Sequence, residues 1–502
     1  MTLMPEVPTT AGFVRGRWEK SVAVFRGIPY AQTPLGPYRF ARPVPPQGWD
    51  GVRDALVFGP PAPQTGAPAS DVDTNWLTVN VWSPNLGTSG LPVMVWIHGG
   101  RYLEGHTANP HYNGAALAAA GVVVVSMNYR VGVEGFAYIA GAPNNRGLLD
   151  QIAALQWVHD NIAAFGGDPT NVTVFGQSAG AGSVAALLTM PASAGLFRRA
   201  IVQSLPGTFF TEELAAGVSA QIAKQLGARA TAVELQHFSP HSLVAASHAL
   251  LAKMPAFADS WGPMALTPTP FSPIVDGVTL SDAPWRLLAS GAGHAIDLLV
   301  GHTRDEYSLF NPWRGKPVTA RHLASTVKQL APESCGPGDY QTAYPRATAS
   351  QLYETVNADW LFRMPSEHLA DAHHAGGGTA RLFELSWSFN PDESASHSLD
   401  VLLVFGTLSH ADITSHPTAN PNAASEFERL SGAMRMDWVA FASNGDPGWA
   451  PYEPGTRITR VYGTDITDET YPEEASRRLW RDHRFTALVP ITSGSGGDVS
   501  VP

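Results

Sequence analysis

The chain has 502 residues, of which 44% are hydrophobic and 15% charged, so it is long enough to bury a large core. Its formal net charge of −11 argues against a nucleic-acid partner, because nucleic-acid binding normally requires a basic surface. The single cysteine, Cys335, excludes internal disulfides and leaves no thiolate cluster for zinc or iron.

The N-terminal residues and the hydropathy set expectations about location. The start, MTLMPEVPTTAG, has neither the basic nor the apolar segment of a secretory signal. No apolar run reaches the roughly 18 residues that a membrane-spanning helix needs. We therefore expect a cytoplasmic protein that does not insert into membranes and is a monomer or weak homo-oligomer. Residues 1–502 are expected to form one domain, with a flexible tail from about residue 492.

Apolar patterns along the chain alternate between strands and helices. Residues 12–63 are rich in Gly, Pro and aromatics and predict short strands and ordered loops, and residues 78–84 predict an edge strand. Residues 148–165 have helical spacing and predict a helix that ends at Gly166-Gly167. Short apolar runs predict buried strands at 92–97, 121–126, 172–175, 200–202, 296–300 and 381–385. The alternation predicts an α/β fold with a mostly parallel sheet covered by helices on both sides.

A serine stands at the sharp turn between the strand at 172–175 and a predicted helix at 181–190. The segment reads NVTVFGQSAG, and Gly176 and Gly180 flank Ser178. Glycines at these places remove Cβ atoms that would collide with the strand and the helix, and the strained turn exposes the serine hydroxyl. The strand, turn and helix context, more than the short G-x-S-x-G pattern, makes Ser178 the candidate nucleophile.

A serine nucleophile also needs donors for the oxyanion that forms when it attacks. The strand at 92–97 runs into IHGGRY, whose paired glycines let backbone N–H groups approach a developing charge closely. The expected donors are the N–H groups of Gly100, Arg101 and Ala179. An ordinary Gly-Gly turn is the alternative interpretation of this stretch alone.

The acid that orients the base is expected to follow the serine in the chain. After the strand at 296–300 the sequence reads GHTRDE, which places Asp305 and Glu306 at the C-terminal end of a strand. Spacing alone does not choose between these two carboxylates.

The base is expected among the 17 histidines of the chain. His397 lies in a loop after the last predicted strand and is the first candidate. His373 and His374, in DAHHAGGG, are more typical of a solvated helix end. His410 and His416 flank a polar loop, where a surface role or a substrate contact is favoured over catalysis.

Long segments of the chain resemble type B carboxylesterases, the cholinesterase-like branch of α/β-hydrolases, and in style the bacterial p-nitrobenzyl esterases. The resemblance runs nearly from end to end. It includes FRGIPYAQTPLGPYRF, WIHGG, NYRVGVEGF, RGLLDQIAALQWVHDNIAAFGGDPTNVTVFGQSAGAGSVAALL, GHTRDEYSLF and SHSLDVLLVFG. It implies an α/β-hydrolase fold with helical insertions around an active-site gorge. It places the catalytic glutamate at Glu306 and the histidine at His397.

The resemblance implies a serine carboxylesterase that hydrolyses short to medium acyl or aryl esters through Ser178, His397 and Glu306 and an acyl-enzyme. It implies neither a metal nor a cofactor, and the partner is a small ester. An amidase or carbamate hydrolase with the same triad is the alternative. A non-catalytic binding module is disfavoured, because such relatives lose the serine or the histidine.

Three further positions lie near the predicted catalytic residues. Gln177 stands where many relatives have glutamate, so one negative charge is absent beside the serine. Arg101 stands where Gly or Ala is usual; we expect its guanidinium to pair with a carboxylate such as Glu104, and the alternative is recognition of an anionic substrate group. Ser204 resembles the family's serine near the histidine, and both a structural and a catalytic role are open for it.

The substrate pocket is the least readable part of the sequence. Phe209, Phe210, Trp261 and Phe271 lie in segments where the family's insertions usually wall the gorge. Aromatic walls would favour hydrophobic or aryl esters. Aromatic residues at such positions are as often part of the core.

Overall fold

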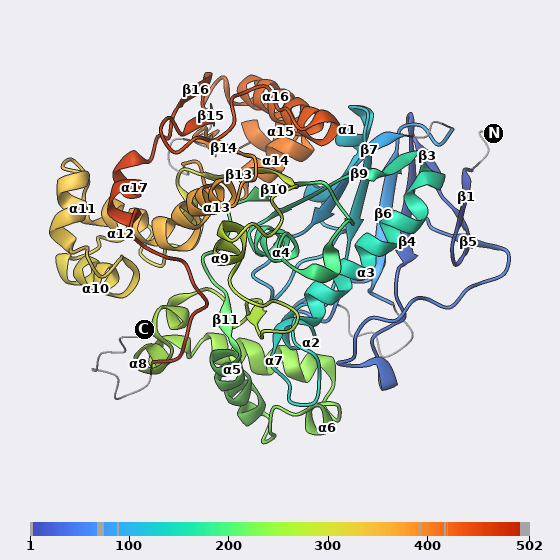
Figure 1. Cartoon of the computed structure of the whole chain (residues 1–502), viewed down its shortest axis with the longest axis horizontal. Coiled ribbons are helices and arrows are strands. Elements are labelled where there is room, and N and C mark those ends of the chain that lie inside the picture. Colours follow the sequence, from blue (N-terminus) through green and yellow to red (C-terminus); the bar gives the residue numbers. More distant parts are fainter. Residues whose placement is uncertain are drawn as a thin grey trace.

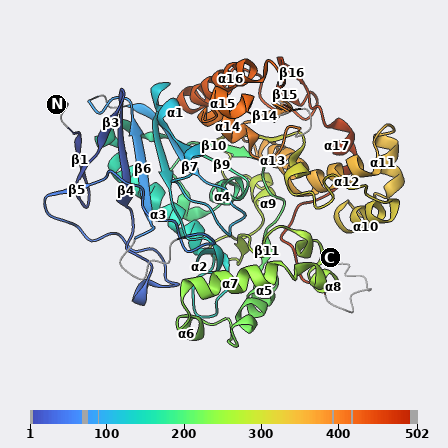
Figure 2. The same ribbon diagram turned by 180° about the vertical axis from the view of Figure 1, so that it is seen from behind.

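A computed structural model describes residues 4–67, 75–87, 90–390, 394–415, 418 and 420–491. Helices cover both faces of a large central sheet (Figures 1 and 2). The predicted α/β class is confirmed. His416 and the tail from residue 492, about which the sequence made predictions, lie outside the described residues.

The central sheet has 11 strands. In chain order they are β3 Arg17–Glu19, β4 Val22–Pro29, β6 Thr78–Ser83, β7 Leu91–Ile97, β8 Val123–Met127, β9 Gly167–Gln177, β10 Arg199–Gln203, β13 Asp297–Thr303, β14 Ala380–Leu385, β15 Ile458–Tyr462 and β16 Ile466–Thr470. In space the order is β16-β15-β14-β13-β10-β9-β7-β8-β6-β4-β3. Neighbours from β15 to β8 run parallel, and antiparallel strands complete both edges. The predicted mostly parallel sheet is confirmed.

The predicted position of one strand at the edge of the sheet was wrong. Residues 78–84 were predicted as an edge strand, but β6 pairs with both β4 and β8, and all six of its residues are buried. The alternation that indicated a half-exposed strand comes from polar side chains that have partners in the interior. The Asn80 amide donates to the hydroxyls of Thr107 and Ser126, at 3.0 and 3.1 Å. In the sequence pattern, a buried polar residue with hydrogen-bond partners thus looks the same as a polar residue that faces solvent.

Each face of the sheet carries its own apolar core. Along β7, Val93, Val95 and Ile97 belong to one core, and Met94 and Trp96 belong to the other. The helices that pack on the first face include α3 Arg146–Asn161, α4 Ala179–Leu187 and α13 Met364–Ala375, and those on the second include α1 Ala115–Ala119, α14 Leu399–Phe405 and α16 Ala423–Asn444. Two-sided burial explains why the central strands are nearly continuous apolar runs.

Helical insertions follow β10 and β13 and form the lower and left-hand parts of the molecule in Figure 1. The first holds α5 Glu212–Gln225, α6 Ala232–Leu235, α7 Pro240–Leu251, α8 Ala258–Trp261 and α9 Pro284–Ala289, and the second holds α10 Ala320–Leu330, α11 Pro337–Ala343 and α12 Ala349–Ala358. The remaining elements are α2 Gly132–Phe136, α15 His410–Thr414, α17 Glu474–Trp480, a sheet of β1 Glu6–Thr9, β2 Gly12–Arg15 and β5 Val52–Asp54, and the pair β11 Phe210–Thr211 and β12 Ile274–Val275. None of the helices in the described residues has both the length and the apolar character that crossing a bilayer requires.

Two local predictions can be compared with the structure. The helix predicted at 148–165 is α3 followed by a 3-10 turn, Ile162–Phe165, which ends at Gly166 with φ of 89°. His373, predicted at a solvated helix end, is instead buried in α13 and bonds the Ile296 carbonyl at 2.8 Å. The prediction was wrong for His373, because that side of α13 faces the sheet rather than solvent.

Candidate active site

Ser178 lies at the turn between β9 and α4. Its backbone has φ of 58° and ψ of −123°, a conformation that non-glycine residues rarely adopt. Its N–H donates to the Gln203 carbonyl of the neighbouring β10 at 2.9 Å, which holds the turn in place. The predicted strand, turn and helix are present, and the serine side chain lines a cavity.

The glycines around Ser178 are required by close backbone packing. A Cβ on Gly180 would lie 2.1 Å from the Ile97 carbonyl oxygen, and one on Gly176 would lie 2.7 Å from the backbone of Gly180. A Cβ on Gly99 would lie 3.3 Å from the Ser178 Cβ. The glycine-rich loop after β7 therefore lies directly against the serine turn.

Glu306 and His397 are in contact beside this turn, where His397 Nε2 lies 2.9 Å from the Gln177 amide nitrogen. Glu306 lies just after β13, and His397 lies in the loop between β14 and α14. The His397 Nδ1–H donates a short hydrogen bond to Glu306 Oε2, while Glu306 Oε1 accepts the Thr303 N–H at 2.9 Å. Both side chains are buried, with 4% of His397 and none of Glu306 exposed. The arrangement fixes one imidazole tautomer and leaves Nε2 as an acceptor.

The charge state of Glu306 follows from its partners. Burial alone would raise the pKa of this carboxyl group, but the His397 charge and the hydrogen bond from His397 outweigh burial and hold the pKa below its usual value. Ser204 is buried at the end of β10 with φ of 57°. Among the described residues its hydroxyl oxygen has no hydrogen-bond partner, so the structure assigns it no hydrogen bond with either Glu306 or Ser178.

Asp305, the other carboxylate that the sequence left open, has a different set of partners. Its N–H donates to the Ala395 carbonyl, and its Oδ2 accepts the Ala395 N–H, each at 3.0 Å. It also pairs with Arg304 at 2.9 Å. Asp305 therefore fastens the loop that carries His397 to the segment that carries Glu306.

The oxyanion loop has an unusual backbone. Gly100, Arg101 and Tyr102 have φ of 119°, 61° and 55°. Within the described residues, no acceptor of the chain bonds the N–H groups of Gly100, Arg101 or Ala179. Unbonded N–H groups beside a helix N-terminus suit an anion.

The Arg101 side chain is part of the same loop. Its guanidinium pairs with Glu104, as expected, and also donates to the Pro268 carbonyl at 3.3 Å. Because Glu104 neutralises the guanidinium, the structure gives no support to recognition of an anionic substrate by Arg101. Arg101 nevertheless lines the cavity beside Ser178.

Aromatic side chains cover the histidine. The rings of Phe310 and Phe362 lie 5.2 and 4.3 Å from the His397 ring, measured between centroids. Phe362 belongs to a π-helical turn, Asp359–Arg363, that joins α12 to α13. Such turns often occur at functional sites. Neither ring was predicted from the sequence. For Phe362 the reason is that DWLFRMP has no pattern that separates a π turn from the helices around it.

The cavity beside Ser178 is small, about 30 Å³. Its wall is formed by Arg101, Tyr102, Ser178, Ala179, Pro206, Thr208, Thr267, Pro268, Thr269, Phe310, Leu361 and Phe362. The four aromatic residues suggested by the sequence are not among them. They are all buried, and two of them pack on other rings, Phe209 on Trp285 and Trp261 on Phe257, while Phe210 begins β11 and Phe271 lies in the core.

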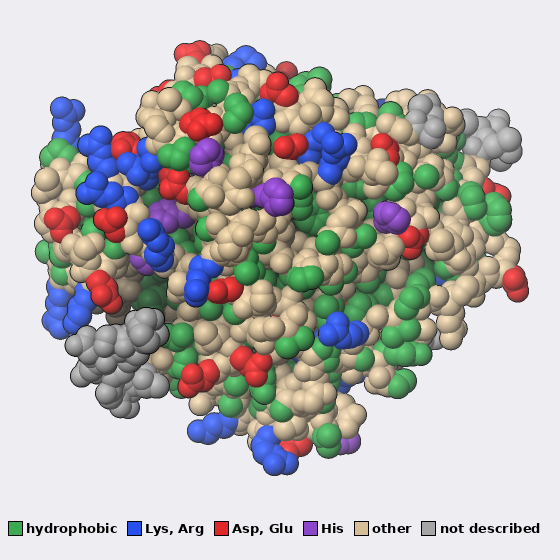
Figure 3. Space-filling model, in the orientation of Figure 1, with side chains coloured by type: hydrophobic (Ala, Val, Ile, Leu, Met, Phe, Trp, Pro, Cys, Tyr) green, Lys and Arg blue, Asp and Glu red, His purple; other side chains and the backbone are tan. Residues whose placement is uncertain are grey.

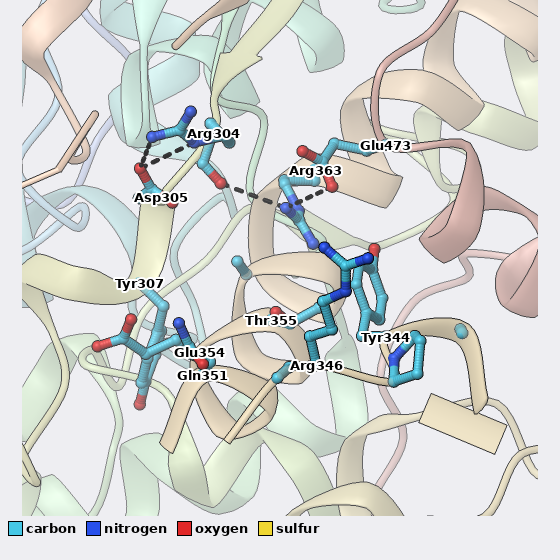
Figure 4. Close-up of a pocket in the computed structure, with 14 residues that line it drawn as sticks. Arg304, Asp305, Tyr307, Tyr344, Arg346, Gln351, Glu354, Thr355, Arg363 and Glu473 are labelled. Carbon is cyan, nitrogen blue, oxygen red and sulfur yellow. Dashed lines mark hydrogen bonds and ion pairs between the residues drawn. The ribbon is translucent and has the colours of Figure 1, made fainter. Parts of the chain in front are cut away.

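A larger hollow of about 680 Å³ is lined in part by two segments that also contribute to the cavity (Figure 4). Tyr307 and Arg363 line the hollow, whereas Phe310 and Phe362, from the same two segments, line the cavity beside Ser178. In the hollow, Arg363 pairs with Glu473 at 3.0 Å. Among the described residues, no cluster of three or more His, Cys, Asp or Glu side chains is arranged to hold a metal ion.

The sequence of this chain matches a known protein family. The family model described as "Carboxylesterase family" matches residues 4–458. The chain belongs to the carboxylesterase family.

Relatives of known activity agree with this assignment. The chain is 36% identical to the para-nitrobenzyl esterase of Bacillus subtilis (strain 168) over 496 residues, which cover 94% of this chain and 97% of the relative. It is 33% identical to the fumonisin B1 esterase of Sphingopyxis macrogoltabida, over 88% of this chain and 82% of the relative. The crystal structure of the Geobacillus stearothermophilus carboxylesterase superposes with a TM-score of 0.82 at 34% identity, over 95% of this chain and 99% of that one. The α/β-hydrolase fold and the esterase class inferred from the sequence are confirmed.

Gln177 gives this carboxylesterase a distinctive contact. Its amide Nε2 lies 2.9 Å from His397 Nε2, and with His397 in the tautomer fixed by Glu306 the amide donates this bond. Among the described residues, the polar partner of Nε2 is therefore this amide rather than the Ser178 hydroxyl. A neutral amide gives the imidazolium no countercharge on this side.

Replacing Gln177 with glutamate tests the contact. The new carboxylate would attract the protonated imidazole, so the acid limb of the pH profile of kcat/KM should move to higher pH by roughly one unit or more. The matched variant Gln177→Met removes the amide without adding charge, so its limb should move upward by less than that of Gln177→Glu. Acid limbs that coincide for the wild type and Gln177→Glu would rule out this electrostatic account.

Asp400 is a second buried carboxyl group near the pair. It lies at the start of α14 and accepts a hydrogen bond from the Gln203 amide at 2.7 Å. Burial is the main reason that its pKa is raised from 3.8 to about 6, and the nearby Glu306 charge adds to the effect. Between these two pH values the folded protein binds a proton that the unfolded chain has released, so the free energy of unfolding falls as the pH rises.

Asp400→Asn should remove this pH dependence. Relative to the wild type, the free energy of unfolding of the variant should increase by up to about 3 kcal/mol between pH 4 and pH 7, whatever the amide costs at a fixed pH. Denaturant unfolding at both pH values measures the difference. Asp482→Asn, at a side chain that is 90% exposed, is the control and should show no such change. A wild type and variant that change in parallel would contradict the prediction.

Proposed function

We propose that the protein hydrolyses carboxylic esters with Ser178 as nucleophile, His397 as general base and Glu306 as the acid that orients it. The observation that carries the proposal is the buried Glu306–His397 hydrogen bond, which lies beside the turn that holds Ser178 at positive φ. The N–H groups of Gly100, Arg101 and Ala179 are proposed as the oxyanion donors, because they are unbonded in the described structure and lie around the serine turn.

In the proposed acylation step, the Ser178 hydroxyl attacks the ester carbonyl carbon and His397 Nε2 takes its proton. The carbonyl π electrons move to oxygen, and the oxyanion accepts hydrogen bonds from the backbone donors. The tetrahedral intermediate collapses with cleavage of the bond to the alcohol oxygen, which leaves with the proton from His397. The products are the free alcohol and an acyl ester of Ser178.

Water then repeats the sequence on the acyl-enzyme. His397 removes a proton from the water as its oxygen attacks the acyl carbon, and the proton returns to Ser178 as the acid departs. Glu306 stays ionised throughout and stabilises the imidazolium, consistent with the lowered pKa of its carboxyl group. The Gln177 amide must yield Nε2 to Ser178 or to water during each step.

We further propose that short acyl groups are preferred. The cavity beside Ser178 is small, and Phe310 and Phe362 restrict its growth. Longer acyl chains require these rings to move. Phe209, Phe210, Trp261 and Phe271 remain weaker predictions as substrate contacts, since none of them lines this cavity.

A substrate panel tests the proposal. Initial rates are compared for p-nitrophenyl acetate, butyrate and octanoate and for the matched amide p-nitroacetanilide. We expect turnover of the acetate and butyrate, slower turnover of the octanoate, and a rate on the amide at least 100-fold lower. A fluorophosphonate should add one phosphonyl group, located on Ser178 by peptide mass spectrometry. Folded protein that neither hydrolyses the esters nor is labelled would refute the proposal, and faster cleavage of the amide would favour the amidase alternative.

Three expectations from the sequence stay predictions. They are a single domain over residues 1–502, a monomer or weak homo-oligomer, and a cytoplasmic location. Light scattering during size-exclusion chromatography measures the second, and fractionation of the source cells measures the third.

A further inference from the structure

A second hollow lies between α9, α13 and the segment that follows α17, and its lining contains none of the proposed catalytic residues. Its volume is about 620 Å³, within the range of small-molecule sites. None of its lining residues lines the cavity beside Ser178. Figure 3 shows Lys and Arg side chains gathered on the side of the molecule that carries α11 and α17.

Three arginines line this hollow, and none has a strong ion pair. Arg286 pairs with Asp282 at 3.2 Å, and Arg481 with its exposed neighbour Asp482 at 3.6 Å. Arg484 donates only to main-chain carbonyls in the part of the chain that the structure describes. Exposed pairs of this kind contribute little free energy, so all three guanidinium groups are available to a ligand.

The single carboxylate in the lining does not balance these charges. Asp371 already accepts a short hydrogen bond from the Tyr452 hydroxyl. Two histidines at or near the hollow have lowered pKa values, mainly because they are buried. Burial, followed by the charges of His483, Arg484 and Arg477, lowers the pKa of His368 to about 3, and burial with the Arg484 charge lowers that of His483 to about 4. Both rings are therefore neutral at pH 7, and the fixed charge of the hollow comes from its arginines.

The floor of the hollow is aromatic. The rings of Trp285 and Phe485 lie 5.2 Å apart at an angle of 31°, and each residue is only 5% exposed. The His368 ring meets Phe485 edge-on at 5.2 Å. Trp480 stacks on the Phe485 ring at 5.8 Å, so Trp285 and Phe485 present ring edges to the hollow rather than a free face. Apolar edges beside guanidinium groups are complementary to a molecule with an apolar body and a negative charge.

We propose that this hollow binds an organic anion with an apolar body, with the carboxylate or sulfonate between Arg481, Arg484 and Arg286 and the apolar body over the edges of Trp285 and Phe485. This site is separate from catalysis and goes beyond the proposed function. It gives an acidic protein one locally basic, partly apolar site for ligands that its overall charge would repel.

Calorimetric titration with 1-naphthoate tests the site, and 1-naphthalenemethanol serves as the uncharged counterpart. We expect the wild type to bind naphthoate at least tenfold more tightly than the alcohol, with affinity that falls as salt rises from 20 to 300 mM. Arg481→Gln with Arg484→Gln should weaken naphthoate binding at least tenfold. Arg478→Gln, on α17 but outside the hollow and with a side chain 72% exposed, is the matched control and should bind as the wild type does.

Two results would overturn the proposal. One is naphthoate binding that the double substitution leaves unchanged. If naphthoate also inhibits ester hydrolysis competitively and equally in the wild type and the double variant, the ligand binds at Ser178 instead of in the hollow. The other is no binding at millimolar naphthoate by wild type that unfolds cooperatively. Equal thermal midpoints of the double variant and the control establish that a loss of binding is not a loss of folding.

Discussion

Ser178→Ala is expected to lower kcat for p-nitrophenyl butyrate by about 10⁵-fold or more. Removal of the nucleophile from a serine triad leaves only the contributions of the oxyanion donors and substrate binding, and the known loss in such enzymes is on the order of 10⁶. KM should change little, because the alanine keeps the backbone donors and the cavity wall. Stopped-flow or long-time steady-state assays on both proteins measure the ratio.

The control for this experiment is another serine of the same helix. Ser183 is buried on α4, accepts a hydrogen bond from the Gln151 amide and does not line the cavity. Ser183→Ala should keep kcat within about tenfold of the wild type. A Ser178→Ala protein that remains folded and retains more than about 1% of the wild-type rate would show that another group forms the acyl-enzyme.

The second large effect is expected for Glu306→Gln, which should lower kcat by about 10³- to 10⁴-fold. The new amide can still accept the Thr303 N–H, but its NH₂ group faces His397 Nδ1. His397 would then carry its proton on Nε2, where it cannot accept the proton of Ser178. Because the substrate does not contact Glu306, KM should stay within a few-fold of the wild type.

Asp305→Asn is the matched control for the acid. Asp305 is the adjacent carboxylate, and it fastens the His397 loop through Ala395, a bond that an asparagine oxygen can still accept. Its loss of activity should not exceed about tenfold. If Asp305→Asn were as damaging as Glu306→Gln, or if Glu306→Gln retained a tenth of the activity, the proposed acid would be wrong.

The serine turn could be predicted from sequence because its requirements are local. An apolar strand, glycines at fixed places and a small-residue helix together specify one backbone path, and the structure has that path at Ser178. The choice between Asp305 and Glu306 could not be made from spacing, because the two residues are adjacent in an irregular segment. The turn after Thr303 decides which carboxylate faces His397, and the family resemblance supplied that information indirectly.

The residues that form the wall of the cavity could not be predicted from the sequence, for a different reason. Phe310 and Phe362 reach His397 from segments 52 residues apart, and one of them depends on a π turn that no local pattern indicates. Phe209 and Phe271 looked equally suitable, yet both are buried away from this wall. Which aromatic residue faces a cavity is decided by tertiary packing, which a single sequence does not contain.

The proposed catalytic residues lie far apart along the chain, so the ribosome synthesises them at different times. Gln177 and His397 touch although 220 residues separate them, and Glu306 and His397 are 91 residues apart. At roughly 5 to 20 residues per second, the serine turn leaves the ribosome at least about 10 seconds before the histidine that would activate it. The nascent chain therefore carries an inert serine until β13 and β14 have joined the sheet, and the appearance of esterase activity reports the completion of that sheet rather than of any single segment.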